Sequence, residues 1–427
     1  MPGQCRVVRD AGIDLSQTAC DLALGKASPH GPSVRARRAV ARRFGAPPAV
    51  ARYIDAAAAV AAASFHSVPS DMPSETRDSS IPSGTLRAAA SDAAASTAEI
   101  VSFLRSVGLV APDSVPKLTE LTGGVASDIW KVETADRVFV VKRARARLRV
   151  AQEWTAPVSR NASEVAWMRT AGAIVPGAVP AILADDASVG AFAMEYLDPG
   201  AFPVWKSELA RGRVDIGFAA AVGRTVAAIH AATAHSEPVA RSFANDAVFH
   251  AIRLEPYLGT TARAQPACAE SLMALSRQTL ATKIALVHGD VSPKNILVGG
   301  RDPILLDAEC AWFGDPAFDV AFCLNHLLLK CIWVPEATDR FLAAYGALED
   351  AYVERLTWEA PDVFERRAAR LLPALMLGRI DGKSPIEYVT TERDKSRVRR
   401  VATALIVSPV ASLADVRDAW ARQLRDA

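Results

Sequence analysis

The sequence predicts an α+β protein with two lobes, a small strand-rich lobe over residues 97–197 and a larger helical lobe over residues 198–427. Three short β-forming runs lie close together between Leu118 and Lys142. Beyond Phe218, long stretches show the hydrophobic period of amphipathic helices. The chain has 427 residues, of which 50% are hydrophobic, so it is long enough to bury a large core without disulfide bonds.

The charge balance and the cysteine pattern indicate which binding partners and which redox compartment to expect. Lys plus Arg number 49 against 47 Asp plus Glu, so nothing favours a nucleic-acid or acidic membrane partner. The six cysteines form no C-x-x-C pair, and Cys310, Cys323 and Cys331 lie in apolar runs. They are typical of buried thiols in a reducing, cytoplasmic compartment. The apolar stretch 56–63 is too short to span a bilayer, and no secretory signal is visible.

Residues 1–95 form an Ala/Arg/Ser-rich extension that differs in composition from the rest. An arginine cluster lies over residues 35–43, and a Ser/Pro/Asp-rich segment runs from Ser67 to Ser83. Such sequence buries little large apolar surface, so we expect it to be disordered or weakly helical. A basic arm or a targeting peptide is the functional alternative. Initiation of translation at Met72 is another.

Order is expected to begin near Thr97, which can cap a short helix that ends near Gly108. Apolar residues occupy one face of this helix, namely Ile100, Phe103, Leu104 and Val107. That face suits packing against a larger body.

A glycine turn joins the first two strands of the small lobe. The strands are expected at Leu118–Leu121, Asp128–Glu133 and Val138–Lys142. Because glycine has no Cβ, backbone N–H groups at Gly123 and Gly124, with Ser127, can approach a polyphosphate closely. The turn is not of the G-x-G-x-x-G form, and an ordinary hairpin turn is the alternative.

A lysine and a glutamate are expected to pair in the small lobe. Lys142 extends the apolar face of its strand, so it should project beside a cleft. A helix is expected over Arg160–Ala171, capped by Ser159 and closed by Gly172, and Glu164 lies on its apolar stripe. A carboxylate there is costly unless it is paired, and Lys142 is the natural partner. Such a pair can orient nucleotide phosphates; the alternative is an unrelated surface glutamate.

Three helices are expected between the small lobe and residue 285, over Phe218–His235, Phe243–Leu258 and Glu270–Thr282. On the first of them we expect His230 to be a packed or capping residue and not a ligand. The apolar strand Ala191–Leu197 precedes these helices and ends before a turn.

The stretch from Leu286 to Lys330 carries the chemistry. Two β-forming runs, Ile296–Val298 and Ile304–Leu306, flank a glycine-containing loop and predict a hairpin. Asn295 and Asp307 then lie together at its open end, with Asp290 a few residues upstream. This set can hold Mg²⁺ and orient a hydroxyl. Glu309 points to the same side if the chain stays extended. The alternative is that these side chains only cap turns.

These residues resemble the aminoglycoside phosphotransferase and choline kinase group of kinase-like small-molecule kinases. The matching residues are His288-Gly289-Asp290, Asn295, Asp307-Ala308-Glu309, Gly314-Asp315-Pro316 and Asp319. The run DAECAWFGDPAFD, and VVKRARARLRVAQEW followed by Arg160 and Glu164, look closest to the 5-methylthioribose kinase branch. The resemblance covers roughly residues 118–335.

The resemblance implies a bilobal protein-kinase-like fold with ATP and Mg²⁺ as cofactors. It implies the following roles: Asp290 as the catalytic base, Asn295, Asp307 and Glu309 as metal ligands, Glu195 and Leu197 as backbone contacts to adenine, Asp319 as a brace of the catalytic loop, and His288 as a scaffold residue. Residues His250, Arg253 and Glu255 lie where this family often builds its acceptor pocket, although a solvated helix face explains them equally well.

The implied function is ATP-dependent transfer of the γ-phosphoryl group to a hydroxyl of a small molecule. The acceptor is a thiosugar-like compound, another hydroxylated metabolite or an aminoglycoside. The basic segment from Arg379 to Arg400 favours a neutral or anionic acceptor over a polycationic one, unless it is an exposed face. We expect no nucleic-acid or membrane partner, and the oligomeric state is not predicted.

Two alternatives remain. A protein Ser/Thr kinase-like enzyme is disfavoured by HGD in place of H-R-D, by DAE in place of D-F-G and by the lack of an A-P-E segment. A non-catalytic nucleotide-binding regulatory protein is disfavoured because every catalytic side chain is present. Generic protein acceptors would test the first alternative, and ATP turnover with hydroxylated metabolites the second.

Overall fold

The computed structural model describes residues 97–121, 127–144 and 160–425. The expectations for residues 1–95, for Gly123 and Gly124 and for the Ser159 cap lie outside the described residues. Within these residues the protein consists of a small antiparallel sheet with two helices and a mostly helical remainder. The predicted α+β class is therefore confirmed.

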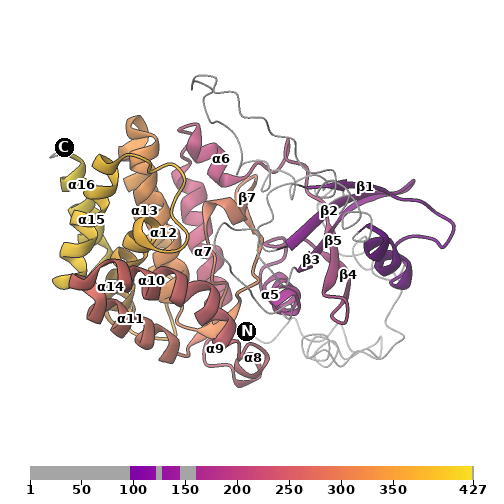
Figure 1. Ribbon diagram of the computed structural model, residues 1–427, viewed down its shortest axis with the longest axis horizontal. Helices are drawn as coiled ribbons and strands as arrows, with labels where there is room; N and C mark the ends of the chain where they lie inside the picture. Colours follow the sequence, from indigo (N-terminus) through magenta and orange to yellow (C-terminus); the bar gives the residue numbers. More distant parts are fainter. Residues whose placement is uncertain (1–96, 122–126, 145–159, 426–427) are drawn as a thin grey trace, which may run out of the picture. The chain divides into compact units, whose positions relative to one another are not determined.

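The small lobe is built on a five-stranded antiparallel sheet in the order β1-β2-β3-β5-β4 (Figure 1). Its strands are β1 (Lys117–Glu120), β2 (Ser127–Glu133), β3 (Val138–Ala144), β4 (Ile182–Asp186) and β5 (Ala191–Glu195). A helix over residues 97–106 places Ile100, Phe103 and Leu104 in one core cluster with Trp130 and Phe139 of the sheet. The expected strands and the expected packing of this first helix are both present.

Helix α5 (Arg160–Ile174) follows β3 in the described chain and continues past the predicted end at Gly172. Gly172 remains helical, and a Cβ at this position would lie 3.0 Å from Val179. The glycine therefore serves close packing against the following segment and does not terminate the helix. The prediction that Gly172 closes the helix is wrong.

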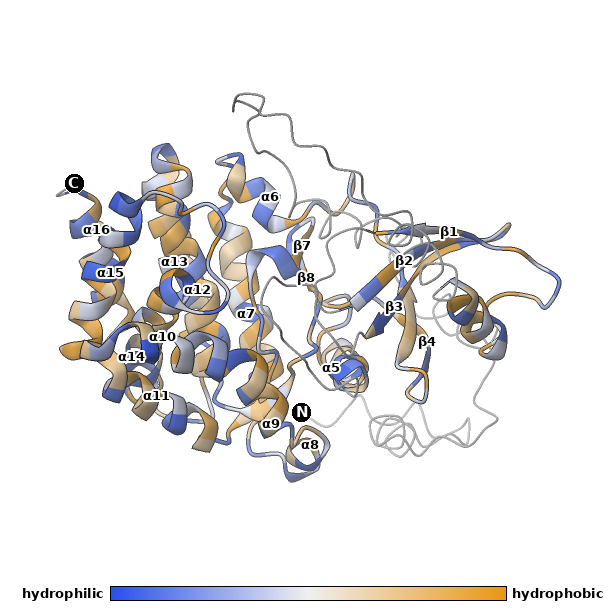
Figure 2. Ribbon diagram, viewed as in Figure 1, coloured by the Kyte–Doolittle hydropathy of each residue, from blue (hydrophilic) through white to orange (hydrophobic). Residues whose placement is uncertain are grey.

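The large lobe consists mainly of helices. Its α-helices are α6 (Trp205–Ala210), α7 (Ile216–Thr233), α8 (Glu237–Ser242), α9 (Asp246–Phe249), α10 (Thr260–Ala264), α11 (Ala269–Ala281), α12 (Ala317–Trp333), α13 (Thr338–Val353), α14 (Pro361–Asp381), α15 (Glu392–Val407) and α16 (Leu413–Arg425). Residues Ala317 to Cys331 of α12 are all buried, and α12 packs against α13 and α14. Hydrophilic and hydrophobic residues alternate along α15 and α16, as expected of helices with one buried face (Figure 2).

Helix α7 packs against α13 and forms part of this core. By length and composition alone α7 would also pass as a membrane span, but 61% of it is buried inside the protein. His230 of α7 is 1% exposed, and its Nδ1 lies 2.9 Å from the Tyr352 hydroxyl. His230 is therefore a packed histidine, as expected.

The helix expected over Phe243–Leu258 is present from Asp246 onward, but part of it is wound differently. The short helix α9 continues directly into a π-helix, η3 (His250–Gly259), which contains Pro256. Proline has no backbone N–H and cannot donate the regular i→i−4 bond, so the wider winding accommodates it.

Two short strand pairs lie at the start of the chemically important stretch. Strand β6 (Ala285–Val287) pairs with β9 (Trp312–Gly314), and β7 (Ile296–Gly299) pairs with β8 (Asp302–Leu305) in the predicted hairpin. The Leu306 N–H donates to the Asn295 carbonyl at 2.9 Å. This bond extends the hairpin by one step and brings Asn295 and Asp307 to its open end.

Candidate active site

Lys142 joins the small lobe to the hairpin. It extends from β3, is 4% exposed, and its Nζ lies 2.7 Å from Oε2 of Glu164 and 2.5 Å from Oδ1 of Asp307. Burial would lower the pKa of Lys142, but the carboxylates of Asp307 and Glu164 raise it above its usual range. The expected contact between Lys142 and Glu164 is present, and the ammonium group stays charged between two carboxylates.

The environments of the two carboxyl groups differ. Burial raises the pKa of Glu164 to about 7, against the opposing effect of Lys142. Asp307 is partly open to solvent, and although burial acts to raise its pKa, the cations Lys142 and Lys294 lower it. Asp307 also has a φ of 66°, in the left-handed region that a non-glycine residue seldom occupies. Such a backbone persists only when the surrounding structure holds it.

The loop that carries Asp290 is held from behind by Asp319, near the start of α12. The backbone N–H groups of His288 and Gly289 donate to the Asp319 carboxylate at 2.7 and 2.8 Å. Gly289 has a φ of 78°, and a Cβ at that position would lie 3.0 Å from both the carbonyl oxygen and the sulfur of Cys310. The loop therefore requires glycine at this position, and Asp319 makes the contacts expected of a brace.

His288 acts as part of this scaffold. Its Nε2 lies 3.1 Å from the Leu306 carbonyl, and the Asp290 N–H donates to its Nδ1 at 3.1 Å. Burial lowers the pKa of His288. A neutral imidazole protonated on Nε2 satisfies both contacts, so the ring links the loop to the hairpin and has no spare nitrogen for proton transfer.

Asp290 is buried, and its two oxygens have different surroundings. Oδ2 lies 2.8 Å from the Arg253 guanidinium and 3.2 Å from the Lys294 ammonium. Oδ1 is buried and has no hydrogen-bond partner within the described part of the chain. Burial would raise the pKa of Asp290, but Lys294 and Arg253 lower it well below its usual range. The arrangement is an ionised carboxylate with one oxygen fixed and the other available to a hydroxyl.

Asn295 and Asp307 provide oxygens suited to a hard cation. The Asn295 amide nitrogen donates to the Asp290 carbonyl at 3.2 Å, which orients the side chain, while its buried Oδ1 has no partner among the described residues. Amide and carboxylate oxygens are ligands that Mg²⁺ accepts, with phosphate oxygens and water completing the coordination. The described residues contain no cluster of three or more His, Cys, Asp or Glu that could hold a metal. A Mg²⁺ site made from Asn295 and Asp307 does not require such a cluster, because phosphate oxygens and water supply the other ligands.

Glu309 does not continue an extended chain from Asp307. Since Asp307 has a positive φ, the condition under which the two carboxylates would share a side is not met. Oε2 of Glu309 instead lies 2.9 Å from Nε of Arg160, at the start of α5. Burial and the nearby charge of Asp307 raise the pKa of Glu309. Its role as a metal ligand stays a prediction.

The other predicted nucleotide contacts lie in the small lobe. Ser127 begins β2 opposite Ala144, and its buried hydroxyl has no partner within the described residues. The Glu195 N–H donates to the Ala181 carbonyl at 2.8 Å. If Glu195 contacts adenine, its carbonyl must therefore do so. Leu197 is 3% exposed, and its role likewise stays a prediction.

Sequence reasoning missed the two cations beside Asp290. Lys294 lies four residues after Asp290, and this spacing was a usable signal. Arg253 lies in η3, and no local feature of the sequence indicates its contact with Asp290. The family resemblance groups it with His250 and Glu255 as acceptor-pocket residues. Glu255 instead pairs with Arg263 at 2.6 Å on a more exposed face.

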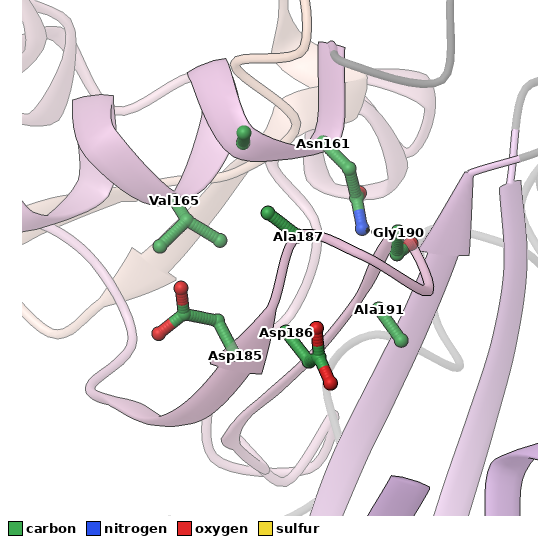
Figure 3. A pocket seen from close by; sticks show the side chains of 8 residues that line it. Asn161, Val165, Asp185, Asp186, Ala187, Gly190 and Ala191 are labelled. Carbon is green, nitrogen blue, oxygen red and sulfur yellow. Dashed lines mark hydrogen bonds between the residues drawn. The ribbon is translucent and has the colours of Figure 1, made fainter.

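A separate small pocket lies between α5 and the turn that connects β4 to β5 (Figure 3). Its lining includes Asn161, Val165, Asp185 and Gly190, and the Asn161 amide donates to the Gly190 carbonyl at 2.5 Å. The cavity of about 20 Å³ is large enough for one water molecule. It includes none of the predicted site residues.

Comparisons with known proteins give the family to which the chain is similar. The model of the phosphotransferase enzyme family matches residues 117–364. A methylthioribose kinase from Yersinia enterocolitica is 24% identical over 295 residues, which are 61% of this chain and 72% of the relative. A methylthioribose kinase from Pectobacterium atrosepticum is 23% identical over 266 residues, covering 56% and 66% of the two chains.

Solved structures also show similarity. An ADP-bound aminoglycoside phosphotransferase matches with a TM-score of 0.41 and 13% identity, covering 77% of this chain and 97% of the other. A choline/ethanolamine kinase family protein from Mesorhizobium loti matches with a TM-score of 0.40 and 15% identity, covering 78% and 99%.

Proposed function

Because the chain belongs to the phosphotransferase enzyme family, we propose that it is a small-molecule kinase that transfers the γ-phosphoryl group of ATP to a hydroxyl. The observation that carries this proposal is that Lys142, from the small lobe, contacts Asp307, which follows the hairpin, at 2.5 Å. This contact joins a group suited to hold phosphates to a group suited to hold their metal ion.

Asp290 directs the acceptor in this mechanism. Its Oδ1, which has no hydrogen-bond partner among the described residues, accepts a hydrogen bond from the acceptor hydroxyl, while Arg253 and Lys294 fix the other oxygen. The hydroxyl oxygen forms a bond to the γ-phosphorus, the bond from that phosphorus to the β,γ-bridging oxygen breaks, and ADP leaves. The hydroxyl proton passes to Asp290 or to water. Since the transition state is loose, a weakly basic carboxylate serves mainly to orient the nucleophile.

Lys142 neutralises phosphate charge and is itself oriented by Glu164. Asn295 and Asp307 would hold Mg²⁺, which when bound supplies positive charge to the phosphate oxygens. Glu309 is a further candidate ligand. Gly123, Gly124 and Ser127 are proposed to lie over the phosphates, and the backbones of Glu195 and Leu197 to contact adenine.

A thiosugar-like or other hydroxylated metabolite is the proposed acceptor class, supported by the two methylthioribose kinases among the relatives. A cytoplasmic location is also proposed, because Cys268, Cys310, Cys323 and Cys331 are buried free thiols.

The experiment is an acceptor screen for ADP release that includes methylthioribose, choline, homoserine, aminoglycosides and a generic protein substrate. Asp290→Asn should reduce kcat by roughly 10²–10⁴-fold, while calorimetry should show unchanged binding of Mg²⁺ with ATP. Asp302→Asn, at the exposed tip of the hairpin, is the matched control. A fully active Asp290→Asn enzyme would refute the assignment, and a preference for the protein substrate would favour a protein kinase.

A further inference from the structure

Helix α12 carries a buried lysine that has no carboxylate partner among the described residues. Lys330 is 1% exposed, and no carboxylate lies within ion-pair distance in the part of the chain that the structure describes. Its ammonium nitrogen lies 4.8 Å from the ring centroid of Trp333 and 4.9 Å from that of Tyr388. Aromatic contact offsets part of the cost of burying a cation, but it supplies no hydrogen-bond acceptor. Lys330 therefore retains unused donors.

The surroundings of Lys330 are positive. Arg379 of α14 uses one nitrogen, Nη1, for three neutral acceptors, the carbonyl and hydroxyl of Ser384 and the hydroxyl of Tyr257. Its Nε is buried without a partner among the described residues. Lys206 pairs with Glu387, the carboxylate that also acts on Lys330. Burial and the charge of Lys206 lower the pKa of Lys330 to about 7. A bound anion would relieve this repulsion.

Tyr388, whose ring lies beside the lysine, carries a further polar group. The hydroxyl of Tyr388 is buried and has no hydrogen-bond partner within the described residues. The Tyr388 ring stacks on Trp333 with centroids 4.4 Å apart, so the hydroxyl is held in place. Trp333, Arg379 and Tyr388 are only half-buried, so the cluster lies close to the protein surface.

A chain of contacts connects the cluster to Asp290. Arg253, which holds Asp290, lies over the ring of Phe322 at 6.0 Å. That ring lies 5.3 Å from His326 and 5.4 Å from Tyr257. His326 is one helical turn before Lys330 on α12, and Tyr257 binds Arg379. Contacts between α12 and η3 therefore link the cluster to Asp290.

We propose that Lys330, together with Arg379 and Tyr388, binds an anionic group, a carboxylate or a phosphate, on the hydroxylated acceptor. This inference rests on the proposed function and narrows its substrate class. An oxyanion supplies the acceptors that the three side chains lack, and charge-assisted hydrogen bonds of this kind are among the stronger ones in proteins. Lys330 lies eleven residues after Asp319 on the same helix, which is a separation of roughly 16 Å along the helix axis.

The test compares acceptors that differ only in the anion. ω-Hydroxycarboxylates of graded chain length are measured against the corresponding diols, and sugar phosphates against the free sugars, with ADP release as the readout. The wild type should prefer the charged member of a pair by roughly 10- to 100-fold in kcat/KM, and the two series distinguish carboxylate from phosphate. Lys330→Met should abolish the preference by raising KM. It should leave the melting temperature unchanged or raised, because a buried charge is removed.

Two further variants control the result. Lys395→Met removes a lysine of α15 that pairs with Glu392 away from the cluster, and it should behave as the wild type. Arg379→Gln tests the subsite independently if Lys330→Met fails to fold. Thermal shifts of the enzyme with Mg²⁺ and ADP, measured with each acceptor, report binding without turnover.

The proposal is overturned if the wild type prefers neutral acceptors, or if both Lys330→Met and Arg379→Gln keep the preference for anionic ones. It is also overturned if no anionic acceptor is phosphorylated and none raises the melting temperature more than its neutral partner does. Failure of the proposed function looks different. In that case the wild type would show no binding of Mg²⁺ with ATP and no ADP release with any acceptor.

Discussion

The ammonium nitrogen of Lys142 lies 2.5 Å from Oδ1 of Asp307, although 165 positions separate the two residues in the chain. Glu164 lies at 2.7 Å from the same nitrogen, so the lysine has a carboxylate on two sides. The phosphates of ATP are anionic and would compete with Asp307 for this ammonium group. We therefore expect nucleotide binding to replace the contact to Asp307 and to leave Glu164 in place, which makes Asp307 available to a cation.

Lys142→Met should lower kcat/KM for ATP by roughly 10²-fold or more, because the cation beside the phosphates is lost. The single variant also leaves Glu164 buried without its partner, which should cost about 3–5 kcal/mol of folding free energy. The double variant Lys142→Met/Glu164→Leu should recover much of that stability and none of the activity. Urea unfolding and steady-state kinetics measure the two effects, with Lys131→Met on the neighbouring strand as control. Recovery of activity in the double variant would contradict the role of Lys142.

Asn295→Ala should raise the Mg²⁺ concentration needed for half-maximal activity by about tenfold or more, because an oriented oxygen is removed from the metal site. Calorimetric binding of ADP should show the same loss when Mg²⁺ is present and no loss when it is absent. Asn295→Asp keeps an oxygen at this position and should retain metal binding better than alanine does. An unchanged Mg²⁺ requirement in Asn295→Ala would remove this residue from the metal site.

Asp319→Asn should reduce kcat by roughly 10- to 100-fold without weakening ATP binding. One of the two loop N–H groups, at His288 or Gly289, would then face an amide nitrogen in place of an oxygen. An unsatisfied buried donor of this kind costs about 1–3 kcal/mol, which a lowered melting temperature should report. A purely structural role would lower the melting temperature and leave kcat per folded molecule unchanged, so kcat must be corrected for the folded fraction.

Glu349 should make the protein less stable as pH rises. Burial, with the charge of Glu365, raises the pKa of Glu349 from 4.5 to about 7 in the folded state. The folded protein therefore holds this proton more tightly than the unfolded chain, and the stabilisation present below pH 4.5 is lost as pH rises through 7. Glu349→Gln should flatten this dependence and stabilise the protein at pH 8 by on the order of 2 kcal/mol. Urea unfolding at pH 5 and pH 8 checks the sign; equal pH dependence in both proteins would contradict it.

The sequence pattern predicted those elements well whose formation depends on residues close together in the chain. The hairpin β7–β8 follows from two β-forming runs around a glycine-containing loop, and the neighbours Asn295 and Asp307 follow from its closure. The partner of Glu164 was predictable because a buried carboxylate on an apolar stripe requires a cation. This pairing could be predicted without knowing how the strands and helices are arranged in space.

The departures from the predictions have identifiable physical causes. Gly172 reads as a helix end, yet the approach of Val179 lets the helix continue, and this approach depends on packing outside the helix. The expected helix over Phe243–Leu258 ignored the effect of Pro256 on its winding. The direction of Glu309 depended on an extended Asp307, whose left-handed backbone is imposed by the surrounding fold.

The sequence by itself determined the α+β class, most elements, and the set of acidic, amide and basic groups from which a phosphotransferase site can be built. Apart from the Lys142–Glu164 pair, only the tertiary structure decided which cation faces which carboxylate, with Arg253 and Lys294 on Asp290 and Arg160 on Glu309. It likewise left Lys330 without a carboxylate partner in the part of the chain that the structure describes. The reason is that periodicity and turn chemistry act over a few residues, whereas the partner of a buried charge is set by the packing of elements far apart in the chain.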